Sequence, residues 1–152
     1  MRSAGLIMMA ALIWGSLSAQ NLDKVFEDYI ALKNHLVNSD YASALSSGEL
    51  LVTSLDNLKE VSTDKSLVED LLRSTKAIAE AGTIEQQRTA FAEQSVLMWQ
   101  LINESEALGR DIYYNYCPMK KAHWISEAAA IRNPFYGKQM LSCGKVEKSI
   151  KP

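Results

Sequence analysis

Apolar residues recur at helical spacing through the first two thirds of the chain and predict four amphipathic helices. The first predicted helix covers about residues 22–37. The second and third begin after Asp40 and Asp64, because aspartate favours the position that caps the start of a helix. The fourth follows Thr83, and Gln86 three residues later completes a capping-box pattern. Short polar links and the absence of proline favour an antiparallel up-and-down four-helix bundle over residues 20–109.

The pattern changes after Gly109. Residues 112–117 alternate as a strand does, and residues 146–150 predict a second short strand. Between them, residues 125–131 contain three consecutive alanines and predict a short helix. We therefore expect a mainly all-α fold in which residues 110–152 form a small irregular cap with one or two short strands, as part of the same domain.

The first 19 residues have the layout of a secretory signal peptide. Arg2 is positively charged, residues 4–17 form an apolar run, and small residues lie around Ala19. The run is shorter than the roughly 20 residues that a transmembrane helix needs. We expect a periplasmic or secreted protein with no stable membrane insertion after signal removal, in an oxidising compartment.

Charge is distributed unevenly along the chain. Residues 20–109 carry fifteen acidic and seven basic side chains, and residues 110–152 carry three acidic and eight basic ones. The formal net charge of −2 gives no reason to expect nucleic acid as a partner. Only two histidines are present and no catalytic motif surrounds them, so we do not expect an enzyme.

The only two cysteines lie in the predicted cap, each near a methionine. Cys117 precedes Met119 by two residues, and Met140 precedes Cys143 by three. Thiolate and thioether sulfur prefer soft ions such as Cu(I) and Ag(I). We interpret these four residues as a candidate soft-metal site, with His123 as a fifth candidate ligand. Zinc fits less well, because zinc sites usually pair their cysteines closely in sequence.

The same two cysteines also fit a second interpretation. An even number of cysteines in an exported chain also predicts a disulfide, here Cys117 to Cys143. The protein would then be a non-enzymatic interaction module whose cap the disulfide holds.

Aromatic residues of the cap are the candidate partner-binding residues in that second reading. We expect an exposed surface for a protein partner from a set of five aromatic residues: Tyr113, Tyr114, Trp124, Phe135 and Tyr136. The alternative is that the tyrosines pack the cap onto the helices and that Trp124 anchors it there, or covers a bound cation.

Two segments of the cap resemble a known bacterial domain of unknown function. They are YYNYCPM at residues 113–119 and IRNPFYGKQMLSCG at residues 131–144, with His123-Trp124 between them. That domain occurs alone in exported proteins and fused to the periplasmic adaptor subunits of copper- and silver-type efflux pumps. Its usual Asn-Pro-Tyr is Asn-Pro-Phe here. The resemblance implies an exported Cu(I)- or Ag(I)-binding protein that buffers the metal or hands it to an efflux adaptor through the four sulfur residues.

Overall fold

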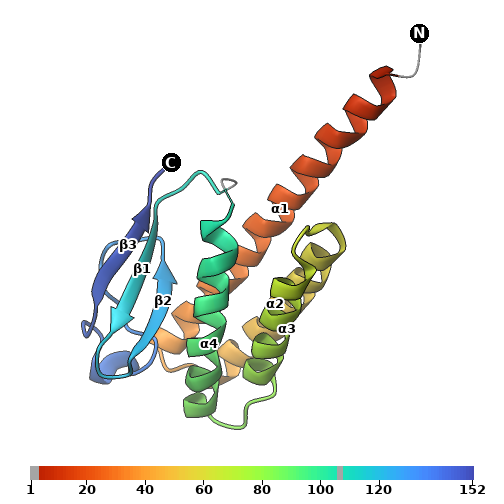
Figure 1. The fold of residues 1–152 in the computed structure, drawn as a ribbon. Helices are drawn as coiled ribbons and strands as arrows, with labels where there is room; N and C mark the ends of the chain where they lie inside the picture. Colours follow the sequence, from red (N-terminus) through yellow and green to blue (C-terminus); the bar gives the residue numbers. More distant parts are fainter. Residues whose placement is uncertain (1–3, 106–107) are drawn as a thin grey trace.

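The computed structural model describes residues 4–105 and 108–152, with side chains from residue 17 onward. Four helices pack in chain order, and a three-stranded antiparallel sheet lies beside them (Figure 1). The elements are α1 (Ala4–Val37), α2 (Tyr41–Val61), α3 (Lys65–Ala79), α4 (Ile84–Asn103), β1 (Ile112–Cys117), β2 (Ala122–Ser126), the short 3-10 helix η1 (Gly137–Gln139) and β3 (Lys145–Ile150). The predicted fold class, a mainly helical bundle with a small C-terminal cap, is confirmed.

Three helices start where the sequence predicts. In α2, α3 and α4 the residue before the helix accepts a hydrogen bond from a backbone N–H three residues later: Asp40 from Ser43 at 3.1 Å, Asp64 from Leu67 at 3.0 Å and Thr83 from Gln86 at 3.2 Å. These bonds satisfy donors that a helix leaves free at its first turn. Gly48 does not interrupt α2. A Cβ atom there would lie 3.3 Å from Ala79, so the glycine lets α2 and α3 approach closely.

Helix α1 is longer than the predicted helix over residues 22–37. It runs without a break from Ala4, through the segment with signal-peptide character, and its first part projects beyond the other helices (Figure 1). Among the described residues, no helix has both the length and the apolar character needed to span a membrane.

A buried tyrosine joins the bundle to the cap. The ring of Tyr29 on α1 stacks on Phe91 of α4 at 5.2 Å between centroids. Its hydroxyl lies 2.8 Å from Ser95 Oγ and accepts the backbone N–H of Ile125 at 2.9 Å. Burial raises the pKa of Tyr29, so this hydroxyl remains a neutral donor and acceptor. The outer edge of β2 is thereby fixed to α1.

The cap is a sheet in the order β2-β1-β3 and contains one strand more than expected. The prediction of a helix over residues 125–131 is wrong, because β2 ends at Ser126 and residues 127–130 form bends. Trp124 and Ile125 are fully buried opposite β1, whereas the three alanines are exposed. Strand pairing and burial of two large side chains outweigh the modest helix preference of three alanines.

Candidate functional site

The two cysteines meet on one face of the sheet. Cys117 is the last residue of β1 and is fully buried, and Cys143 lies in the turn before β3 and is half-buried. Their Sγ atoms are 4.0 Å apart, and the thiols are not joined. The sequence placed both residues in one candidate site, and the fold brings them into contact.

Both sulfurs accept backbone hydrogen bonds from the turn between β1 and β2. Lys120 N–H points to the Cys117 sulfur at 3.4 Å, and Met119 N–H bonds the Cys143 sulfur. Burial raises the pKa of Cys143, and the neighbouring Cys117 thiol raises it further, whereas the Met119 N–H acts in the opposite direction. Cys143 is therefore protonated at neutral pH in the absence of a bound ion. The N–H groups of Met119 and Lys120 would stabilise negative charge on the sulfurs once a proton is lost.

Asn133 holds the segment that carries Cys143. Its side chain is fully buried, donates to the carbonyl of Cys143 at 2.7 Å and accepts the N–H of Phe135 at 2.7 Å. Its backbone N–H also donates to the carbonyl of Leu141 at 2.8 Å. The side chain of Asn133 therefore connects the two ends of the loop over residues 133–143. An asparagine before a proline is typical of such turns, and this is the signal that could have singled out Asn133.

Two glycines let this loop pack closely. Gly144, which follows Cys143, has φ of +147°, and a Cβ there would lie 2.6 Å from the Trp124 ring. Gly137 has φ of +54°, and a Cβ there would lie 2.4 Å from Ser39 Oγ. These contacts press one end of the loop on Trp124 and its middle on the corner between α1 and α2. The position of Cys143 is therefore set by the packing of the cap on the bundle.

The methionines are not equivalent. Met119 is 62 % exposed, although its backbone N–H reaches the Cys143 sulfur. Met140 is half-buried, and its carbonyl accepts the N–H of Cys143 at 3.0 Å. The two cysteine side chains are therefore in contact, Met119 is largely in solvent, and Met140 is joined to Cys143 through its backbone.

His123 lies on the opposite face of the sheet from the cysteines. It pairs with Tyr116, whereas Cys117 pairs with Ala122, and neighbouring residues of a strand point to opposite faces. Its ring stacks on Tyr114 at 4.6 Å, and its Nε2 lies 2.9 Å from the carboxylate of Glu147 on β3. The structure does not bring His123 to the cysteines. Glu147 becomes its neighbour only through the pairing of β3 with β1, so this contact could not be predicted from the sequence.

The expected exposed aromatic surface is not formed as one patch. Trp124 is fully buried, Phe135 is 4 % exposed and packs on Trp124, and Tyr114 is 6 % exposed and stacks on Trp99 of α4. These three residues anchor the cap to the bundle and leave little surface for a partner. Tyr113 and Tyr136 are half-buried, and the hydroxyl of Tyr113 bonds Asp111 and Lys151.

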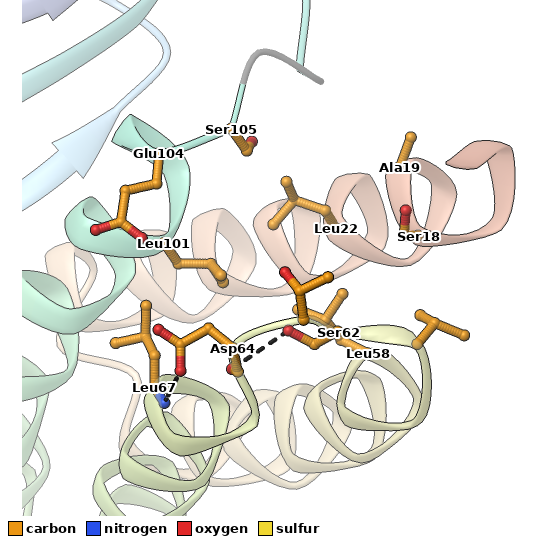
Figure 2. Close-up of a pocket in the computed structure, with 12 residues that line it drawn as sticks. Ser18, Ala19, Leu22, Leu58, Ser62, Asp64, Leu67, Leu101, Glu104 and Ser105 are labelled. Atoms are coloured by element: carbon orange, nitrogen blue, oxygen red, sulfur yellow. Dashed lines mark hydrogen bonds between the residues drawn. The ribbon is translucent and has the colours of Figure 1, made fainter. Parts of the chain in front are cut away.

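A pocket of about 300 Å³ lies away from these residues, between α1, the turn that joins α2 to α3, and the end of α4. Figure 2 shows Leu22 of α1, Leu58 of α2, Leu67 of α3 and Leu101 of α4 lining it beside the capping bond of Asp64. None of the residues predicted as site residues lines this pocket. The described residues also hold no group of three or more His, Cys, Asp or Glu side chains suited to a metal ion.

The fold and the paired thiols define a helical-bundle protein with a cysteine-bearing β cap. The model of a family described as a protein of unknown function (DUF3347) matches residues 25–108, more than half of the chain, and the chain belongs to this family. The match covers α1 from residue 25 onward and all of α2, α3 and α4, and it ends before β1, so it does not include the cap segments that carry the resemblance. No curated protein and no solved structure matches the chain.

Proposed function

We propose that the protein binds one monovalent soft metal ion, Cu(I) or Ag(I), between the Sγ atoms of Cys117 and Cys143. The observation that carries the proposal is the 4.0 Å separation of two free thiols. Zinc-thiolate bonds are about 2.3 Å long, so two sulfurs that share an ion of similar radius lie at most about 4.6 Å apart. The sulfurs therefore fit one coordination sphere with little movement.

The donor set favours a soft monovalent ion over zinc. A structural zinc site takes four ligands, usually cysteine or histidine, and His123 lies on the other face of the sheet. Cu(I) and Ag(I) accept fewer ligands and also bind thioethers. We propose Met140 as the additional donor, because it lies on the Cys143 loop and is less exposed than Met119. The hydrogen bonds from Met119 and Lys120 would stabilise the thiolates of the loaded site.

In this proposal the protein is not an enzyme. It is exported, and it buffers the ion in the periplasm or passes it to an efflux adaptor. The signal-peptide layout of residues 1–19 and the resemblance of the cap segments support this setting. Cell fractionation of a C-terminally tagged chain tests the location. Growth of a deletion strain on copper and silver salts tests the role, and unchanged tolerance to both metals would argue against it.

The binding test is a competition between the reduced full-length protein and a chromophoric Cu(I) chelator without oxygen. We expect one equivalent of Cu(I), complete loss of binding in the double variant Cys117→Ala/Cys143→Ala, and about tenfold weaker binding in Met140→Leu. Met98→Leu is the matched control, because Met98 is fully buried in α4 and a volume-conserving change there alters only packing. A reduced wild-type protein that leaves all Cu(I) on the chelator contradicts the proposal.

A second candidate function rests on the same contact. If the sulfurs approach by about 2 Å they reach disulfide length, and the cap becomes a covalently closed interaction module without a metal. Closing this loop would stabilise the fold by roughly 3.5 kcal/mol in the chain-entropy model. Alkylation of the freshly isolated protein before and after reduction, read by mass spectrometry, decides between the two. Two alkylated cysteines without reduction support the metal site, and none supports the module.

A further inference from the structure

The turn between β1 and β2 has an unusual surface. Met119 is the most exposed large apolar side chain that is described, at 62 %. Lys120 and Lys121 follow it, and both are exposed without an ion-pair partner among the described residues. An exposed thioether thus lies beside two unneutralised positive charges. Methionine suits adaptable contacts, because its side chain is flexible and polarisable.

Access to the thiols runs through the same turn. Cys117 has no exposed surface, whereas Cys143 is half-buried and receives the Met119 N–H on its sulfur. A ligand that approaches from solvent therefore meets Met119 and Cys143 before Cys117. The buried cysteine is the more permanent anchor for an ion, and the half-exposed one is the easier to replace.

We infer that the turn formed by Pro118, Met119, Lys120 and Lys121 is the surface through which a bound Cu(I) ion is transferred to a partner, and that the partner is an acidic protein surface bearing two cysteines. The inference rests on the proposed function. The two lysines attract and orient the acidic surface. Met119 gives the ion a transient sulfur ligand during the exchange.

The exchange is a ligand substitution without electron transfer. The incoming thiol loses its proton as its sulfur binds the ion, which at that stage contacts both cysteines and Met119. The bond to Cys143 then breaks, and Cys143 takes up a proton. The bond to Cys117 breaks last: a second thiol of the partner loses its proton as its sulfur binds the ion, and Cys117 takes up a proton. Copper remains Cu(I) throughout.

Two synthetic peptides test the inference. Both contain a Cys-x-x-Cys segment, flanked in one by four glutamates and in the other by four glutamines. Stopped-flow mixing with the Cu(I)-loaded full-length protein gives the second-order rate constant of transfer. At low salt we expect about tenfold faster transfer to the acidic peptide, and the difference should shrink at high salt, where exposed charges are screened.

Three variants separate the contributions. Lys120→Glu/Lys121→Glu should remove or reverse the preference for the acidic peptide. Met119→Leu should slow transfer to both peptides by about tenfold, which is more than it weakens Cu(I) binding at equilibrium. The control Lys65→Glu/Lys76→Glu makes the same change of charge on exposed positions of α3 and should leave the preference intact.

The outcomes are distinct. A wild-type protein that binds no Cu(I) overturns the proposed function and this inference with it. Tight binding combined with equal rates for both peptides overturns only the inference. If sedimentation shows dimers of the wild type that the charge-reversal variant lacks, the turn binds a second copy of the chain, and the assignment of an acidic partner is wrong.

Discussion

The side-chain amide of Asn133 donates a hydrogen bond of 2.7 Å to the backbone carbonyl of Cys143. The bond joins two residues that are ten positions apart in the sequence. The position of the Cys143 thiol therefore depends on a buried side chain that cannot itself bind a soft ion. The candidate site is therefore a product of loop geometry as much as of its two sulfurs.

Replacing Asn133 by alanine should separate loop geometry from ligand chemistry. The variant loses the bond to Cys143 and leaves the N–H of Phe135 unpaired in the interior, so we expect a loss of about 2–4 kcal/mol in the free energy of unfolding. Cu(I) affinity should also fall, although every sulfur remains. The matched control is Asn34→Ala on the exposed side of α1, which should change stability by less than about 0.5 kcal/mol. Wild-type Cu(I) affinity in a folded N133A protein would contradict this role.

Gly144 offers a sharper test of the packing behind Cys143. A Cβ at this position would lie 2.6 Å from the Trp124 ring and 3.0 Å from the Tyr116 carbonyl. Gly144→Ala should therefore cost about 3 kcal/mol or more, and alkylation of Cys143 should become faster as the turn moves outward. Gly109→Ala is the control, because Gly109 also has a positive φ, of +51°, but nothing lies within 4 Å of a Cβ there. Chemical denaturation of both variants separates the steric clash from the backbone strain, which should be about 1 kcal/mol in the control. Equal losses in the two variants would show that contact with Trp124 is unimportant.

The sequence predicts the parts of this structure that depend on neighbouring residues. The caps at Asp40, Asp64 and Thr83 and the bounds of β1 follow from local chemistry, and all are observed. Strand β2 does not follow from local chemistry, because it depends on pairing with β1, and the helix predicted over residues 125–131 does not form.

The same distinction applies to the candidate site, where some features could be predicted from the sequence and others could not. Two cysteines in one small cap had few other places to lie, so their contact could be expected. Two other features could not be predicted, namely which face of the sheet carries His123 and how deeply Tyr114 is buried. Each depends on an element that is distant in the sequence. His123 follows from the register of β2, and Tyr114 is covered by Trp99 of α4. A single histidine or tyrosine close in sequence to a motif is therefore weak evidence that it belongs to the same site, until the strand pairing is known.

Acid should loosen β3 before it unfolds the bundle. The hydrogen bond from His123 lowers the pKa of Glu147, and the hydrogen bond from Lys151 lowers that of Asp111, so both carboxylates stabilise the folded state above their unfolded pKa values. This contribution is lost as the pH falls through the lowered folded values, in the range below about pH 4.5. Hydrogen exchange read by mass spectrometry should show β3 losing protection at a higher pH than α2 or α3.

The variant Glu147→Gln/Asp111→Asn checks the cause. In this variant the amides of β3 should be less protected from hydrogen exchange at neutral pH than in the wild type. Their protection should also change less as the pH falls. Glu49→Gln serves as the control, because Glu49 is exposed on α2 and forms no ion pair among the described residues. Simultaneous loss of protection in β3 and the helices of the wild type would contradict the expected order.

Lys33 should make the protein more stable as the pH rises. Its side chain is 6 % exposed on α1 and forms no hydrogen bond or ion pair among the described residues. Burial lowers the pKa of Lys33 to about 8, with Arg132 adding to the shift and Glu127 opposing it. Between this value and the unfolded value of 10.5 the unfolded chain binds more protons, so the free energy of unfolding rises with pH, by on the order of 3 kcal/mol in total. Below about pH 8 both states carry the charge, and the full cost of burying it remains.

The substitution Lys33→Met removes the charge and keeps an unbranched apolar side chain. We expect this variant to be about 1–3 kcal/mol more stable than the wild type at pH 7, with the difference shrinking as the pH rises through 8 to 10.5. Urea unfolding at several pH values, with a reductant present, measures the difference between the two proteins and cancels groups that titrate in both. Lys76→Met on the exposed side of α3 is the control and should differ from the wild type by less than about 0.5 kcal/mol at every pH. A constant difference between Lys33→Met and the wild type across this range would mean that the amine finds water or a carboxylate in the folded state and keeps its ordinary pKa.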